Sequence, residues 1–175
     1  MLWGDFLLRR IRRELALLLE NAPILGLGAF LCCFGGILLW VNGGSGWYLL
    51  RRAGERGMPG LTASFLLWLC AYGLIGMALA MIALADRLRC LRRNLGLPAF
   101  ALGAAAYLLM LLWYVLFFCT HLTLLSVLLL LLSLALVGML LIVTKRTFLA
   151  LSVCLILVEA VQFFFLIRAL MYYFC

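Results

Sequence analysis

The sequence predicts an all-α membrane protein, in which a bundle of five transmembrane helices follows a short N-terminal amphipathic helix. Of the 175 residues, 69% are hydrophobic and only 11% are charged, whereas a soluble domain is about 45–50% apolar and about 25% charged. The mean hydropathy is +1.27. The basic residues behind the net charge of +8 lie between apolar runs. We therefore expect them to face the anionic headgroups of membrane lipid, and we expect no binding to nucleic acid.

Residues 2–19 have the pattern of an amphipathic helix that lies at the membrane surface. Four arginines lie within this segment. An apolar stripe repeats every four residues at Trp3, Leu7, Ile11 and Leu15. The next apolar run, 22–41, is longer than the usual core of about 7–15 residues in a cleavable signal peptide, so we expect the first transmembrane helix there. Asn21 is a candidate N-cap for this helix.

One long loop is expected after the first span, at residues 42–62. Loops of this length in compact proteins often act as lids over a site, and this loop contains Trp47 and Tyr48. The second span is predicted at 64–85, and a basic connection follows it.

The segment from Leu97 to Val143 contains 47 residues and no charge. As one helix it would be about 70 Å long, roughly twice the hydrocarbon core of a bilayer. It must therefore fold back on itself, and the polar cluster near its middle divides it into spans of 97–119 and 124–143. The last span is predicted at 148–171, so that the chain 1–175 forms a single membrane domain.

The loop charges predict the topology. The N-terminal segment and the connections after the second and fourth spans carry four, four and two basic residues. The opposite side carries three in the long loop and none at the third turn. By the positive-inside rule, the N-terminus lies in the cytoplasm, and we expect the cell membrane as the location.

Two of the predicted spans carry aromatic residues on one helical face. Trp68, Tyr72 and Gly76 recur every four residues in the second span, and Trp113, Phe117 and His121 do so in the third. These rings could enclose a flat apolar ligand, or they could be packing residues between helices. Gly76 and Ala80 also offer a small-residue face for contact with another helix.

The same residues fit two longer motifs. The pattern W-x-x-L-Y-x-x-M-G-x-A is matched by Trp68, Tyr72, Gly76 and Ala78, while Ala71 and Ile75 stand where Leu and Met are usual. The pattern N-x-x-W-x-x-L-F-F-x-x-H is matched by Trp113, Leu116, Phe117, Phe118 and His121. The chain thereby resembles the TspO/MBR family, the tryptophan-rich translocator or peripheral benzodiazepine receptor proteins. Its specific motifs cover residues 68–121. Met110 stands where that family has Asn, so we expect a more apolar pocket.

This resemblance implies a pocket between helices that binds a hydrophobic small molecule, for transport or sensing. A tetrapyrrole such as a porphyrin is the first ligand that it implies, a sterol-like molecule is the second, and a homodimer is also implied. The candidate ligand-binding residues are Tyr48, Trp68, Tyr72, Trp113, Phe117 and Glu159.

Glu159 is a candidate for its position as well as its chemistry. It lies near the centre of the last span, where an ionised carboxylate costs at least about 2.5–3.5 kcal/mol. Since no Lys or Arg lies at a comparable depth, we expect Glu159 to be protonated or hydrogen-bonded to another helix. It either contacts a polar group of the ligand or belongs to an interhelical hydrogen bond in which Gln162, one turn on, takes part.

We expect neither an enzyme nor a bound cofactor. The seven cysteines form no C-x-x-C pair and the chain has one histidine, so the sequence offers no metal cluster and no nucleophile–base pair. The alternative function is that of a structural or assembly subunit whose helix faces bind a partner protein.

Overall fold

The computed structural model describes residues 2–42, 61–91, 95–118, 120, 122–145 and 147–174, with the side chains of all but 2–7, 61–62, 118, 123 and 171–174. These residues form six α-helices and no strand. The helices are α1 (Leu2–Glu20), α2 (Ala22–Asn42), α4 (Leu61–Arg87), α5 (Gly96–Phe118), α6 (Thr123–Thr144) and α7 (Leu149–Phe174).

Five of these helices, α2 and α4 to α7, are long and apolar enough to cross a membrane. The predicted amphipathic helix and the five predicted spans are each confirmed, and their ends differ from the observed ends by at most three residues. The uncharged run folds back where expected, because α5 ends at Phe118 and α6 begins at Thr123. The protein is therefore an integral membrane protein. The predicted lid-like loop, 42–62, lies almost wholly outside the described residues.

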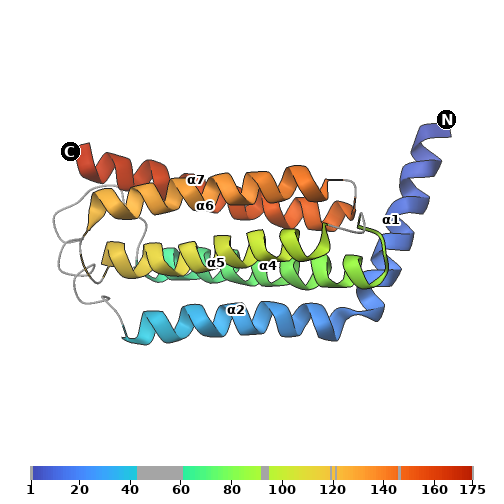
Figure 1. Ribbon diagram of the computed structural model, residues 1–175, viewed down its shortest axis with the longest axis horizontal. Helices are drawn as coiled ribbons and strands as arrows, with labels where there is room; N and C mark the ends of the chain where they lie inside the picture. The colour runs from blue at the N-terminus through green and yellow to red at the C-terminus, as the bar shows by residue number, and fades with distance from the viewer. Residues whose placement is uncertain are drawn as a thin grey trace.

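Helix α4 is at the centre of the bundle. It packs against α2, α5 and α7, and α6 packs between α5 and α7. Figure 1 shows the five long helices side by side, with the two ends of the chain at opposite ends of the bundle. Buried side chains recur along the whole of α4, among them Trp68, Tyr72, Ile75, Ala78, Ile82 and Ala85. Large apolar side chains on the outer surfaces of the bundle remain exposed, as expected where lipid covers them.

Glycines allow α2 to approach α4 closely. A Cβ atom on Gly28 would lie 2.6 Å from the carbonyl oxygen of Gly76 and 2.9 Å from the Cβ atom of Ala80. A larger residue at position 28 would therefore force the two helices apart. Membrane helices depend on such contacts because lipid tails are as apolar as leucine and no hydrophobic effect drives helices together. The predicted contact face of Gly76 and Ala80 is confirmed.

The end of α4 is closed by a residue in the left-handed region. Arg89 has φ 55°. The N–H of Cys90 donates to the carbonyl of Ala85 at 2.8 Å, and the N–H of Arg89 donates to the carbonyl of Asp86 at 3.0 Å. These two bonds form a Schellman motif, in which glycine is the usual left-handed residue. They turn the chain sharply toward α5.

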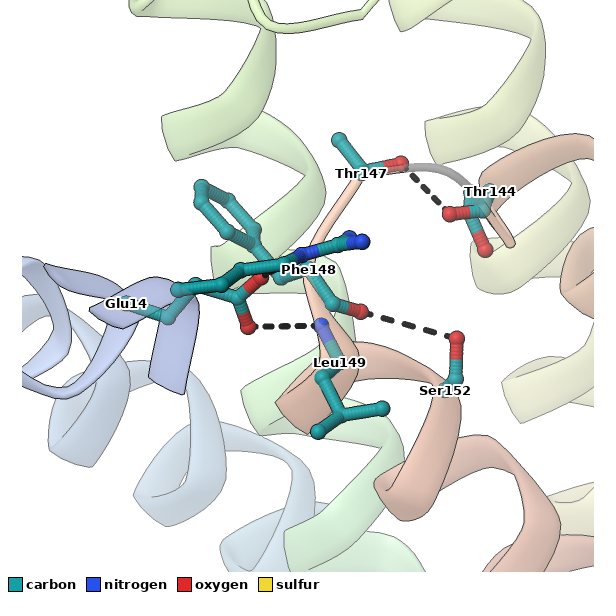
Figure 2. Close-up of polar contacts among 7 residues, drawn as sticks. Glu14, Thr144, Thr147, Phe148, Leu149 and Ser152 are labelled. Atoms are coloured by element: carbon teal, nitrogen blue, oxygen red, sulfur yellow. Dashed lines mark hydrogen bonds and ion pairs between the residues drawn. The ribbon is translucent and has the colours of Figure 1, made fainter. Parts of the chain in front are cut away.

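Helix α1 is attached to the end of the bundle by Glu14 (Figure 2). The Oε2 atom of Glu14 accepts a hydrogen bond from the N–H of Leu149, at the start of α7, at 2.7 Å. Its Oε1 atom accepts from Nε of Arg10 at 2.9 Å. The first N–H groups of a helix have no partner in their own helix, and a helix N-terminus favours negative charge. Glu14 therefore caps α7 from a position 135 residues away in the sequence.

The direction of α1 differs from that of the other helices. Figure 1 shows it inclined steeply to the axis that the five long helices share. At its junction with α2, the side-chain amide of Asn21 donates to the carbonyl of Leu17 at 2.8 Å. Asn21, the candidate N-cap of the first span, thus binds the end of α1 with its side chain. Ile11 and Leu15 of the apolar stripe are exposed, which suits a face that contacts lipid.

We predict that Glu14→Ala exposes the first turn of α7. Loss of a carboxylate cap costs about 1 kcal/mol, so the amide of Leu149 should exchange its hydrogen roughly fivefold faster. Hydrogen exchange measured by NMR on the detergent-solubilised protein reports this amide directly.

Glu20→Ala is the matched control, because Glu20 is an exposed glutamate of the same helix and its side chain makes no hydrogen bond or ion pair within the residues that the structure describes. It should leave the exchange of Leu149 unchanged. Equal exchange rates in the two variants would contradict the assignment of Glu14 as the cap of α7.

Candidate functional site

Five aromatic rings meet at the contact of α4, α5 and α7, and we call them the aromatic cluster: Trp68, Tyr72, Trp113, Phe117 and Phe165. Trp68 of α4 stacks on Trp113 of α5, with 4.7 Å between ring centroids. Phe165 of α7 lies 5.0 Å from Trp68 and 5.9 Å from Trp113. The cluster continues along α5, where Phe117 stacks on Trp113 at 5.2 Å. Three helices thus contribute rings to one contact.

The aromatic cluster is closed in this structure. None of its five residues is more than 3% exposed. The centroid distances fall within the range of about 4.5–7 Å for rings in direct contact. A ligand could therefore bind among these rings only if some of them moved apart.

Helix α2 packs against one side of the cluster through Gly36. A Cβ atom at this position would overlap the ring of Tyr72, so glycine lets α2 lie directly on that ring. Tyr72 also meets Tyr107 edge-to-face at 5.9 Å, and its hydroxyl donates a long hydrogen bond of 3.5 Å to the carbonyl of Met110. Met110 thus offers a backbone oxygen and a fully buried apolar side chain.

Trp68 carries a polar group that the cluster does not satisfy. Its Nε1 atom is buried and donates no hydrogen bond within the part of the chain that the structure describes. A buried donor without an acceptor costs about 1–3 kcal/mol. The ring of Trp40 lies 4.5 Å from that of Phe65, near the same end of the bundle. Its Nε1 atom is also buried and donates no hydrogen bond within the described residues.

The structure brings together four of the six candidate ligand-binding residues, namely Trp68, Tyr72, Trp113 and Phe117. Sequence reasoning missed Phe165. The run Phe163-Phe164-Phe165 was a visible signal, but its spacing did not indicate which ring faces the other helices. Tyr48 and His121 lie outside the described residues, so the role predicted for Tyr48 stays a prediction.

Glu159, the sixth candidate, lies on a different face of α7. A Cβ atom on Gly138 of α6 would lie 3.1 Å from its Oε1 atom, so the carboxyl group is directed toward α6 at a position where a glycine makes room for it. Glu159 is partly exposed. Phe165 is six residues further on, roughly 9 Å along the helix axis. A shared ligand would therefore have to extend over more than one and a half helical turns.

An interhelical hydrogen bond does form in this part of α7, but Gln162 makes it and Glu159 takes no part in it. The Nε2 atom of Gln162 donates to Oγ of Ser133 on α6 at 3.0 Å, and that hydroxyl donates to the carbonyl of Ala106 on α5 at 3.2 Å. All three residues are fully buried. Each lies close to the middle of its span, so a polar chain joins three helices near the centre of the bilayer.

The described residues contain no candidate metal site. Within them, no three His, Cys, Asp or Glu side chains lie close enough together to hold a metal ion.

In comparisons with protein-family models, curated proteins and solved structures, nothing matched this chain. The TspO/MBR resemblance therefore stays a prediction that rests on the motifs alone.

We predict that Ser133→Ala destabilises the bundle by about 1 kcal/mol, because it leaves Nε2 of Gln162 without its acceptor. Adding Gln162→Leu should destabilise it no further, since the amide that needed a partner is then gone. Unfolding by sodium dodecyl sulfate, followed by circular dichroism, measures both changes.

Ser152→Ala provides the control. The hydroxyl of Ser152 lies on α7 and donates only to the carbonyl of Phe148 in the preceding turn, so its loss should cost less than about 0.5 kcal/mol. If Ser133→Ala were no more destabilising than Ser152→Ala, the polar chain would contribute nothing to stability.

Proposed function

We propose that the protein binds a flat hydrophobic molecule that carries hydrogen-bond acceptors at its edge, and that the molecule enters the aromatic cluster between α4, α5 and α7. A porphyrin is the ligand class that we put first, and a sterol-like molecule is second. The binding would serve transport or sensing in the membrane. The observation that carries the proposal is the buried indole N–H of Trp68, which has no acceptor in the described structure and lies within a stack of rings.

The energetics of such binding are favourable. A planar ligand that separates two stacked rings replaces one aromatic contact with two, and each contact is worth about 0.5–1.5 kcal/mol beyond the area that it buries. A carboxylate or carbonyl on the ligand would also accept from Nε1 of Trp68 and so remove a desolvation penalty of about 1–3 kcal/mol. These contacts with the ligand therefore offset the free-energy cost of opening the closed cluster.

The charge distribution supports a membrane orientation for this function. The end of the bundle at which α1 lies carries most of the described basic residues. These are the arginines of α1, Arg87 at the end of α4 and Lys145 after α6. By the positive-inside rule, this end faces the cytoplasm, and the ends of α2 and α7 face the other side of the cell membrane. The family resemblance that suggested the ligand class also suggests a homodimer.

The test is a titration of the purified protein with protoporphyrin, followed by tryptophan fluorescence. We expect saturable quenching, and we expect Trp68→Phe to weaken binding by about tenfold, because phenylalanine keeps the ring but lacks the donor. Trp3→Phe, in the amphipathic helix at the opposite end of the bundle, is the control and should leave the affinity unchanged.

Protoporphyrin dimethyl ester separates stacking from hydrogen bonding. If Trp68 donates to a carboxylate, the ester should bind the original protein more weakly than the acid does, and Trp68→Phe should bind both alike. Absence of quenching in a sample with full helical circular dichroism would reject the proposal. The closed cluster would then be a packing core, as expected for a structural or assembly subunit.

A further inference from the structure

A groove runs along the lipid-facing side of the contact between α4 and α7. Its walls are formed by Leu67, Cys70 and Leu74 of α4 and by Ala160, Val161 and Phe164 of α7. The spacing of three or four residues places each set on one helical face. Alanine and cysteine between bulkier side chains leave the hollow, which has a volume of about 460 Å³. This volume lies within the range of about 300–1,000 Å³ that is usual for small-molecule sites.

One end of the groove is marked by a cation. The guanidinium of Arg168 lies 5.5 Å from the ring centroid of Phe164, one turn along α7. Arg168 lies in the last two turns of α7, which ends at Phe174, and its long side chain can extend from there to the level of the lipid headgroups. Among the carboxylates whose side chains the structure describes, none pairs with Arg168. Glu159 is directed toward Gly138 of α6, away from the groove.

We propose that this groove is a binding site for an anionic phospholipid, with one acyl chain between α4 and α7 and the phosphate on Arg168. The site is distinct from the aromatic cluster and does not depend on the function proposed for it. Lipid tails gain little by exchanging other lipid tails for an apolar groove. Selectivity must therefore come from the headgroup, for which the planar guanidinium is the matching partner because it can donate two parallel hydrogen bonds to a phosphate.

Charge also distinguishes a lipid from a second copy of the chain in this groove. A two-fold axis along the membrane normal brings the same residues of two copies face to face. Such a dimer would place the two Arg168 side chains at the same depth, where like charges repel each other. A lipid phosphate at this depth supplies the opposite charge instead.

The test is native mass spectrometry of the full chain in detergent, titrated with phosphatidylglycerol or with phosphatidylcholine of the same acyl chains. We expect the protein to retain phosphatidylglycerol with roughly fivefold or greater preference, which is the contribution of one basic side chain to binding an anionic lipid. Arg168→Gln should abolish this preference and leave the weaker, headgroup-independent binding in place. Lys145→Gln, which removes a cation at the opposite end of the bundle, should retain it.

A second variant tests the groove itself. Ala160→Phe adds a ring to an exposed position and should reduce the retention of both lipids, while far-ultraviolet circular dichroism checks that the variant is folded. Cys70→Trp fills the groove from α4 if the first variant is unstable. Equal retention of the two lipids by the original protein, or a preference that survives Arg168→Gln, would overturn the proposal. A dimer in the original protein that is lost in Ala160→Phe would assign the groove to a second copy.

Discussion

The stack of Trp68, Trp113 and Phe165 is the contact on which the arrangement of the bundle depends. Helices in lipid are not driven together by the hydrophobic effect, so their positions follow from close packing and interhelical hydrogen bonds. This stack joins α4, α5 and α7 at one point. The remaining helices are fitted to these three, because α6 is tied to them by the polar chain through Ser133 and α2 lies on α4 at Gly28.

The stack also explains why the candidate site is closed although it contains an unsatisfied polar group. Its rings fill the space between the helices, but Trp68 leaves a donor unsatisfied at the centre. Phe164 and Phe165 meet edge-to-face at 5.4 Å, and one of them lines the lipid-facing groove while the other belongs to the cluster. The two proposed sites are therefore neighbours on α7, one within the bundle and one outside it.

Hydropathy was sufficient to predict the helices of this protein. In a bilayer every backbone polar group must be bonded internally, so each uncharged run of suitable length has to be a helix. The turn between Phe118 and Thr123 followed from the length of the uncharged run and from the polar cluster near its middle. Hydropathy was insufficient to predict which faces meet, because each span is apolar around its whole circumference and gives no stripe to orient. The spacing of Trp68 and Tyr72 indicated which face of α4 contacts other helices. Phe165 has phenylalanine at the two preceding positions, so the sequence did not indicate which of the three rings faces the bundle.

Polar contacts between distant segments were the other unpredictable part. A mid-membrane Gln162 needs a partner, but several hydroxyls lie at a comparable depth, and the choice of Ser133 depends on the rotation of two helices. The bond from Leu149 to Glu14 joins residues 135 positions apart. The N-terminus of α7 has free N–H groups that need an acceptor. The sequence around α7 does not indicate that α1 supplies this acceptor.

Binding at the aromatic cluster is tested most directly by the NMR signal of the Trp68 indole N–H, assigned by its disappearance in Trp68→Phe. If a porphyrin carboxylate accepts from this group, its proton resonance should move downfield by a large fraction of a part per million as protoporphyrin is added. The signal of Trp3 should stay in place. A Trp68 resonance that does not move at saturating protoporphyrin would contradict ligand binding at the stack.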